Sequence, residues 1–135
     1  MLEKTKGFTL IEVMIVVVII AVLASVGYPA YQRHIYKGRQ AVAKSALEST
    51  RLAMENYKAR NGAYPGSGES VTLLGVAEEA DTTDVKAKYK LTINSSSAEG
   101  FILKAECNID SDGTLDIWTI NQLGTLSNTK NDIAE

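Results

Sequence analysis

The chain has 135 residues and a formal net charge of −2, from 14 basic and 16 acidic side chains. This length fits one small domain, and the weak net acidity argues against a general nucleic-acid binder. With one cysteine and one histidine, and no serine elbow, phosphate-binding glycine loop or zinc spacing, the sequence indicates neither an enzyme nor an intramolecular disulfide.

The N-terminal segment is a polar leader, residues 1–7, followed at once by an apolar run. No charged residue occurs from Val13 to Gln32, and 20 residues of helix span about 30 Å, the thickness of the hydrocarbon core of a bilayer. An ordinary secretory signal is cut after its apolar stretch, which is discarded. Here the small residue suited to a cut, Gly7, comes first. We therefore expect the apolar stretch to remain on the mature protein.

One carboxylate, Glu12, stands at the start of the apolar run. A carboxylate costs up to about 3 kcal/mol at the membrane centre, and a plain membrane anchor gains nothing from it. Glu12 therefore predicts a role beyond anchoring.

Helical character continues past the membrane-length segment. Apolar or small side chains recur at steps of four and three residues, at Ala43, Leu47, Thr50, Met54 and Tyr57. This spacing predicts one helix from about Phe8 to Arg60, ended by Asn61-Gly62, whose second half packs under a globular domain.

Pro29 interrupts the apolar half of this predicted helix. Proline removes one intrahelical hydrogen bond and clashes with the preceding turn, so a kink or local melting is expected near Ser25–Pro29. A kink of this kind is tolerated in membrane helices.

The C-terminal half of the chain reads as a loop followed by a sheet. Residues 62–84 are rich in polar and turn-forming residues, whereas 85–94, 101–107 and 115–121 alternate between apolar and polar, with a short further segment at 125–127. The pattern predicts an α+β fold in which the helix lies against an antiparallel sheet of about four strands. Cys107 falls at an inward position, which favours a buried core thiol over a reactive one.

One segment has the spacing of the first half of a calcium loop. Oxygen-bearing side chains occupy its positions 1, 3, 5 and 9, with glycine at 6: Asn108, Asp110, Asp112, Asp116 and Gly113. The twelfth position, where a bidentate glutamate is needed, is Thr119. The segment is therefore either a calcium site or a tight Asp-Gly turn between two strands, and no other cofactor is indicated.

The Gly-Phe-Thr-Leu-Ile-Glu string of residues 7–12, followed by more than a dozen aliphatic residues, resembles the prepilin signal of type IV pilins and of type II secretion pseudopilins. The resemblance covers residues 1–60 strongly and the rest in outline. It implies that a prepilin peptidase cuts after Gly7 and methylates the new N-terminus, Phe8. The implied segments are a leader (1–7), a hydrophobic assembly helix (8–32) and a globular head (33–135).

The resemblance also implies the division of the head and a departure from many relatives. The head would consist of a helix (33–61), a variable loop (62–84), a sheet (85–127) and a tail (128–135). Many pilins close a C-terminal loop with two cysteines, and this chain, with Cys107 alone, departs from that pattern.

In this family the glutamate matching Glu12 is thought to pair with the N-terminal amine of the neighbouring subunit. An ion pair inside an apolar bundle sets register, because any slip leaves an unpaired buried charge that costs about 3–5 kcal/mol. The resemblance thus implies that Phe8 and Glu12 direct assembly. Pilins similar to this chain also carry a proline at the position of Pro29, where unwinding in the fibre would make it extensible.

Three functions follow as alternatives. The first is a structural subunit of an extracellular type IV pilus, used in adhesion, twitching motility or DNA uptake. The second is a type II secretion pseudopilin in a short periplasmic filament; calcium binding would favour it, because major pseudopilins bind calcium in a C-terminal loop. The third is a membrane-anchored binding domain that never polymerises.

The first two functions imply the same partners. These are identical subunits in a homopolymer, a prepilin peptidase, an inner-membrane platform protein, an assembly ATPase and an outer-membrane secretin. The precursor would be inserted in the inner membrane before assembly.

Overall fold

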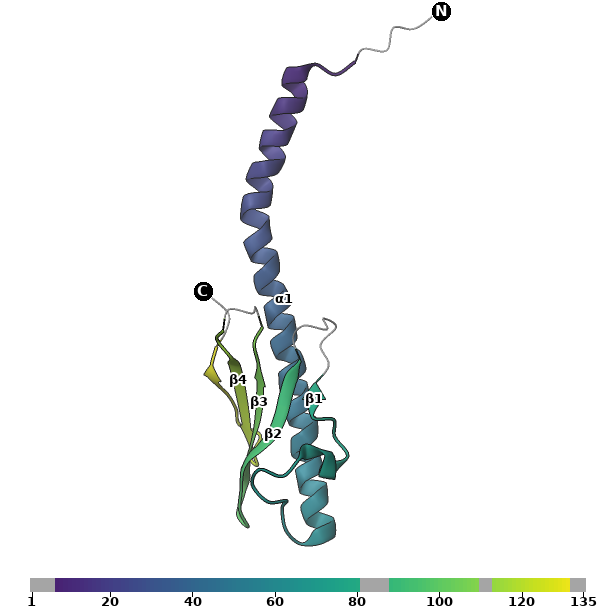
Figure 1. Ribbon diagram of the computed structural model, residues 1–135, viewed down its shortest axis with the longest axis vertical. Helices are drawn as coiled ribbons and strands as arrows, with labels where there is room; N and C mark the ends of the chain where they lie inside the picture. The colour runs from purple at the N-terminus through teal and green to yellow at the C-terminus, as the bar shows by residue number, and fades with distance from the viewer. Residues whose placement is uncertain (1–6, 81–87, 110–112, 132–135) are drawn as a thin grey trace, which may run out of the picture. The chain divides into compact units, whose positions relative to one another are not determined.

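The computed structural model describes residues 7–80, 88–109 and 113–131. Its elements, in chain order, are α1 (Leu10–Asn61), a 3₁₀ helix η1 (Val71–Leu74), β1 (Glu79–Ala80), β2 (Tyr89–Ser96), β3 (Phe101–Cys107), β4 (Asp116–Asn121) and β5 (Leu126–Lys130) (Figure 1). The chain divides into two compact units, Met1–Ile35 and Tyr36–Glu135. The first contains the N-terminal half of α1, and the second contains the rest of α1 and the sheet. We call the second unit the head.

The helix α1 has clear local reasons to begin and end where it does. It starts one residue after Thr9, whose side chain caps it, and it ends before Gly62, which has φ 81° and whose N–H donates to the Lys58 carbonyl at 2.7 Å. Glycine takes this left-handed conformation without steric cost and so serves as a helix stop. The bounds agree with the predicted helix to within two residues.

Pro29 lies inside α1, and the helix is unbroken on both sides of it. Of the two alternatives expected near Ser25–Pro29, a kink or local melting, the single chain does not show the melting, and the kink stays a prediction. The missing N–H of Pro29 still deprives the Ser25 carbonyl of its helical partner, which leaves this turn the weakest point of the hydrogen-bond ladder.

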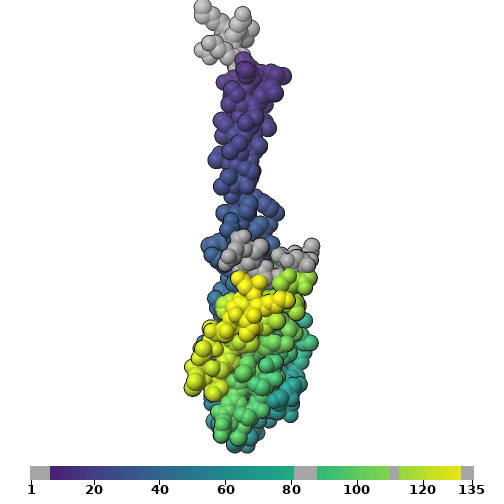
Figure 2. Space-filling model, turned by 90° about the vertical axis from the view of Figure 1, so that its left-hand side faces the viewer, coloured from purple at the N-terminus to yellow at the C-terminus, as the bar shows by residue number. Residues whose placement is uncertain are grey.

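The sheet is an antiparallel meander in the order β1-β2-β3-β4-β5. The predicted α+β fold is confirmed, with five strands where about four were expected. The strand at 101–107 has its predicted bounds, β4 begins one residue later than predicted, and β5 runs on to Lys130. The added strand, β1, has two residues, too few to show alternation. Figure 2 shows the head from the side on which green and yellow strands lie outermost.

The core of the head lies between the second half of α1 and one face of the sheet. The helix contributes Ala43, Leu47, Thr50 and Met54, all fully buried, and the sheet contributes alternate residues: Tyr89, Leu91, Ile93, Phe101, Leu103, Ala105, Cys107 and Ile120. The predicted helical stripe and the buried cysteine are thus confirmed, whereas Tyr57 is only partly buried. Burial of alternate strand residues against a helical stripe is what sets the register of helix and sheet.

Tyr64 ties the start of the loop to the helix. Its hydroxyl donates to Glu55 Oε1 at 2.8 Å, its ring meets Phe101 edge-on with centroids 4.9 Å apart, and Lys58 Nζ lies 4.3 Å from the ring centroid. Burial and the Glu55 carboxylate together raise the pKa of Tyr64 above its ordinary value. The hydroxyl therefore stays protonated and keeps donating throughout the neutral range.

A buried carboxylate, Asp116, joins the helix to three strands. Its Oδ1 accepts from Gln40 Nε2 and Asn128 Nδ2, both at 3.0 Å, and its Oδ2 accepts from the Tyr89 hydroxyl and from Trp118 Nε1 at 2.8 Å. The side chain is fully buried. Four donors satisfy the carboxylate, and they come from α1, β2, β4 and β5.

These contacts bear on the segment for which the sequence left two alternatives, a calcium site or a tight Asp-Gly turn. Asp116, the ninth position of that spacing, is the first residue of β4 and is buried, and its carboxylate oxygens are occupied by the four donors. Asp110 and Asp112 lie outside the described residues. Asn108 lies beyond the end of β3 and is partly buried.

Replacing Asp116 with alanine would remove an acceptor from four buried or half-buried donors, of which Gln40 Nε2 also donates to Asn131 Oδ1 at 3.0 Å. Each unsatisfied buried donor costs roughly 1–3 kcal/mol, and we expect Asp116→Ala to lower the free energy of unfolding by at least about 3 kcal/mol. Urea unfolding of the detergent-solubilised full chain, followed by Trp118 fluorescence, measures this. The control is Glu106→Ala, which removes a partly exposed ion pair with Lys104 and should cost under about 1 kcal/mol. Equal losses in the two variants would contradict the assigned role of Asp116.

Candidate assembly site

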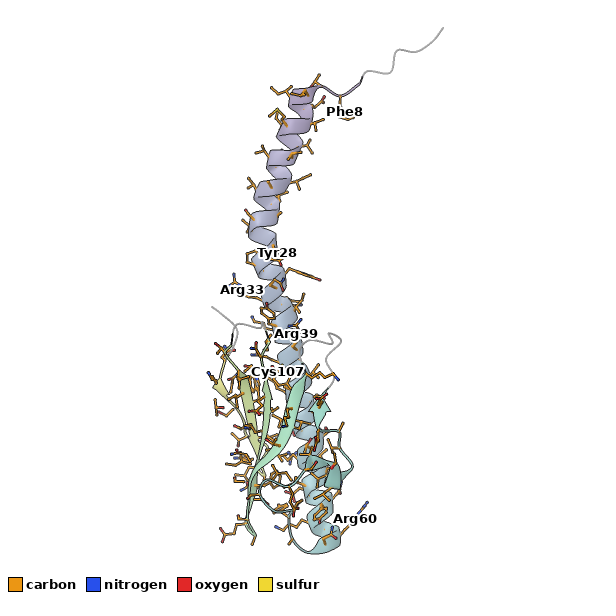
Figure 3. The ribbon with its side chains drawn as sticks, in the orientation of Figure 1. Phe8, Tyr28, Arg33, Arg39, Arg60 and Cys107 are labelled. Atoms are coloured by element: carbon orange, nitrogen blue, oxygen red, sulfur yellow. The ribbon has the colours of Figure 1, made fainter. Side chains whose placement is uncertain are left out.

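The N-terminal half of α1 has no apolar partner within the described chain. Aliphatic side chains at every position around the helix, from Leu10 to Val26, are each at least half exposed to solvent. Figure 3 shows these side chains projecting on all sides of the helix below Phe8. Among the described residues, α1 is the one helix whose length and composition suit a membrane span. Such a surface is stable only against lipid or against other helices.

Glu12 and Thr9 form a reciprocal cap at the start of α1. The Glu12 N–H donates to Thr9 Oγ1 at 3.3 Å, while Glu12 Oε2 accepts from the Thr9 N–H at 3.3 Å and from the Thr9 hydroxyl at 3.4 Å. This is the capping box of the pattern Ser/Thr-x-x-Glu. Thr9-Leu10-Ile11-Glu12 carries this pattern in the sequence, but the sequence-based prediction rested on the charge of Glu12 alone and did not include the cap. In the single chain, then, Glu12 is a capping residue on an exposed helix end.

The peptide bond between Gly7 and Phe8 lies outside the helix. Both residues precede α1 in irregular structure, and Phe8 is 83% exposed. The predicted cut site is therefore accessible, as a protease requires of its substrate. A cut there would place a new amine on the residue next to Thr9, within the same helix start that holds Glu12.

Pro29 lies far from this helix start. It is 17 positions beyond Glu12 in an unbroken helix, a separation of about 25 Å. Near it, the Ser25 hydroxyl donates to the Val22 carbonyl at 2.8 Å, and Gln32 Nε2 donates to the Tyr28 hydroxyl at 2.8 Å. The predicted site residues thus fall in two places, with Gly7, Phe8 and Glu12 together at the start of α1 and Pro29 apart from them.

The described residues do not provide a metal centre. No group of three His, Cys, Asp or Glu side chains among residues 7–80, 88–109 and 113–131 could hold a metal ion. The chemistry available at the helix start is one carboxylate, one cuttable peptide bond and a continuous apolar surface. These suit polymerisation through helix packing.

Two family models match adjoining segments of the chain. Residues 3–28 match the prokaryotic N-terminal methylation motif, and residues 29–114 match the family described as type IV minor pilin ComP, DNA uptake sequence receptor. The first match covers the cut site and Glu12. The second covers most of the head.

Curated relatives match over nearly the whole chain. A fimbrial protein of Neisseria meningitidis is 31% identical over 90% of this chain and 69% of its own length, and the type IV major pilin protein PilE1 of Neisseria gonorrhoeae is 32% identical over 90% and 72%. Among solved structures, the non-core minor pilin PilV of Neisseria meningitidis superposes with a TM-score of 0.54, covering 75% of this chain and 93% of that one at 20% identity. This last likeness concerns the fold.

Proposed function

This chain belongs to the type IV pilin family, and on that premise we propose that it is cut between Gly7 and Phe8 and polymerises through the N-terminal half of α1. It is a structural subunit of a type IV pilus, which sets aside the type II secretion alternative. The anchored domain that never polymerises is likewise disfavoured. The finer steps of processing and assembly are the proposal.

The observation that carries the proposal is the contrast between the two halves of α1. The second half buries its stripe under the sheet, whereas the first half exposes aliphatic side chains all round. Lipid can cover that surface before assembly, and the same segment of other copies can cover it afterwards. Packing of these helices in a filament core would bury the exposed aliphatic side chains without any change in the head.

Glu12 is proposed to act in two ways in succession. In the precursor its carboxylate caps α1 through Thr9. After cleavage, Phe8 carries a positively charged amine, and the Glu12 carboxylate of a neighbouring copy can pair with it in the apolar bundle. Because a slipped neighbour would leave both charges unpaired in a medium of low dielectric constant, the pair selects one register.

The proposed route follows from the need to keep the apolar segment covered. The precursor sits in the inner membrane through residues 8–32, a prepilin peptidase removes residues 1–7, and subunits then leave the membrane for an extracellular filament. An inner-membrane platform protein, an assembly ATPase and an outer-membrane secretin would drive and guide this transfer. At Pro29, the unpaired Ser25 carbonyl marks where the helix would first unwind under load.

DNA contact is a second candidate, because the family matched over residues 29–114 is described as a DNA uptake sequence receptor. The charges of the head argue against strong binding through the sheet. Lys88 pairs with Glu79 at 3.1 Å, Lys104 pairs with Glu106 at 2.8 Å, and the strand register places Lys90 between Glu79 and Glu106. DNA binding depends on basic side chains that neutralise phosphates, and each of these three lysines already lies beside a carboxylate. We therefore place filament building first.

The processing step predicts the N-terminus of the assembled protein. Filaments sheared from cells should contain this chain beginning at N-methylated Phe8, as read by mass spectrometry of the N-terminal peptide. Replacement of Gly7 by a bulky residue, as in Gly7→Leu, should leave residues 1–7 attached and abolish filaments. Filaments built of the uncut chain would contradict the proposal.

The register step predicts that the charge of Glu12 matters more than its cap. Glu12→Gln keeps a side-chain oxygen for the capping box but leaves the neighbouring amine unpaired, and we expect sheared filaments to fall by at least roughly tenfold. Thr9→Val is the matched control, because it removes the cap hydroxyl and keeps the charge; it should assemble almost normally. Helix content in detergent, measured by circular dichroism, should be the same in both. Normal filaments from Glu12→Gln would overturn the register role.

The charge pairing of the sheet predicts weak binding to DNA. Purified filaments should bind a labelled duplex no more tightly than a general non-specific binder, with a Kd of about 10⁻⁴ to 10⁻⁶ M at physiological salt, and without preference between sequences. Fluorescence anisotropy with two unrelated duplexes measures both quantities. Nanomolar binding to one duplex alone would make DNA recognition the function of the head.

A further inference from the structure

Five charged side chains of the second half of α1 share one flank, whereas Arg39 and the exposed Arg60 lie outside it. Lys44, Glu48, Arg51, Glu55 and Lys58 follow one another along the helix, each partly buried. Lys44 Nζ lies 4.2 Å from the centroid of the Trp118 ring, Glu48 and Arg51 pair at 3.0 Å, and Lys58 donates to the Ala98 carbonyl at 3.4 Å. We call this side of α1 the charged flank.

The outward flank is exposed and carries no charge from Ala41 to Asn56, and the exposed Arg60 follows one turn later. Ala41, Ser45, Ser49, Leu52 and Asn56 succeed one another at helical spacing, and all of them are exposed, Leu52 to 55%. The solvent face of a helix is ordinarily the charged one. Here the charges are on the partly buried side and the small uncharged residues face outward, which indicates that another surface covers them.

A groove runs along this uncharged flank. It has a volume of about 490 Å³ and is lined by Ala41, Val42, Ser45, Ala46, Ser49 and Ala80. No charged side chain among the described residues lines it, so it suits an aliphatic group. Ala80 belongs to β1, the edge strand of the sheet.

The described head also presents a protruding aliphatic side chain. Leu123 is 81% exposed, more than any other large hydrophobic residue of the described head. It sits in the turn between β4 and β5, where Asn121 Oδ1 accepts from the N–H groups of Leu123 at 3.1 Å and Thr125 at 2.9 Å. Gly124, with φ 79°, completes the turn. The leucine is therefore held outward by a well-braced turn.

The protruding leucine and the groove lie on different sides of the head. Gly124 is next to the charged flank, because a Cβ built on it would come within 3.7 Å of Arg51 Nε. The groove lies on the uncharged flank beside β1, at the opposite edge of the sheet from β5. One chain cannot place its own Leu123 in its own groove.

We propose that Leu123 of one copy docks in the groove between α1 and β1 of the next copy. Two different surfaces that meet head to tail give an open helical chain of subunits instead of a closed dimer. The contact is small, but packing of the N-terminal helices already holds neighbouring heads together, so the second contact forms at a high effective concentration. The inference rests on the proposed polymerisation and adds to it a contact between heads.

Cysteine cross-linking in sheared filaments tests this contact. In a Cys107→Ser background, Leu123→Cys and Ser45→Cys in the same chain should produce a ladder of covalent oligomers with a short bismaleimide, and the detergent-solubilised monomer should produce none. The matched control replaces Ser45 by the exposed Ser127 of β5, and should give no ladder. A ladder from the control pair alone, or from neither pair, overturns the inference.

Introducing charges at the proposed contact tests it independently of cross-linking. Leu123→Glu should lower the yield of filaments by roughly tenfold, and adding Ser45→Lys should restore much of it by pairing across the contact. Leu73→Glu, a similar change at a leucine that is 55% exposed and outside the groove, should assemble normally. Equal loss with Leu73→Glu, or no rescue by Ser45→Lys, contradicts the contact.

The two proposals fail in different ways. If the wild-type chain builds no filaments, polymerisation itself is refuted and the head contact with it. If the wild-type chain and Leu123→Glu build filaments equally well, polymerisation stands and only the head contact is refuted.

Discussion

A helix with aliphatic side chains on every side cannot remain in water as a monomer, and the N-terminal half of α1 is such a helix. This constraint orders the rest of the chain. In the proposed route, lipid covers the segment of the precursor first, and other copies cover it when it leaves the membrane. The core of the head lies between the second half of α1 and the sheet, so the head does not need the N-terminal half of α1 to bury its own apolar residues.

The apolar surface drives association but does not choose a register, because aliphatic side chains pack nearly as well after a shift of one turn. Selection of one register needs an ion pair, because a displaced neighbour would leave both charges buried and unpaired, at a cost in free energy. Glu12 is the one acidic residue in the first turn of α1, and a cut after Gly7 would create its counter-charge. Cleavage would thus do more than remove residues 1–7, since it would also replace the intramolecular cap through Thr9 by a bond between copies.

Local patterns predicted much of this molecule, and contacts between distant residues escaped prediction. The stripe through Ala43, Leu47 and Met54 repeats at the helical period, and residues 101–107 alternate, so both could be identified from their immediate neighbours. Two of the partners of Asp116, Tyr89 and Gln40, lie 27 and 76 residues away along the chain, and no local sequence pattern predicts such contacts. For the same reason a short-range calcium spacing seemed to account for Asp116, although the fold turns its carboxylate to the core. The cap between Thr9 and Glu12 is a local pattern that could have been predicted from the sequence. It was not predicted because only the charge of Glu12 was considered.

The most direct test of the account is the distance between the Phe8 amine and the Glu12 carboxylate of adjacent subunits in the assembled filament. Filaments grown from a mixture of subunits, some with ¹⁵N at the Phe8 amine and others with ¹³C at the Glu12 carboxyl, allow solid-state NMR to detect this contact between copies alone. The account predicts dipolar dephasing that corresponds to an ion pair, with nitrogen and oxygen within about 4 Å. Filaments that show no such dephasing would contradict the claim that this pair sets the register.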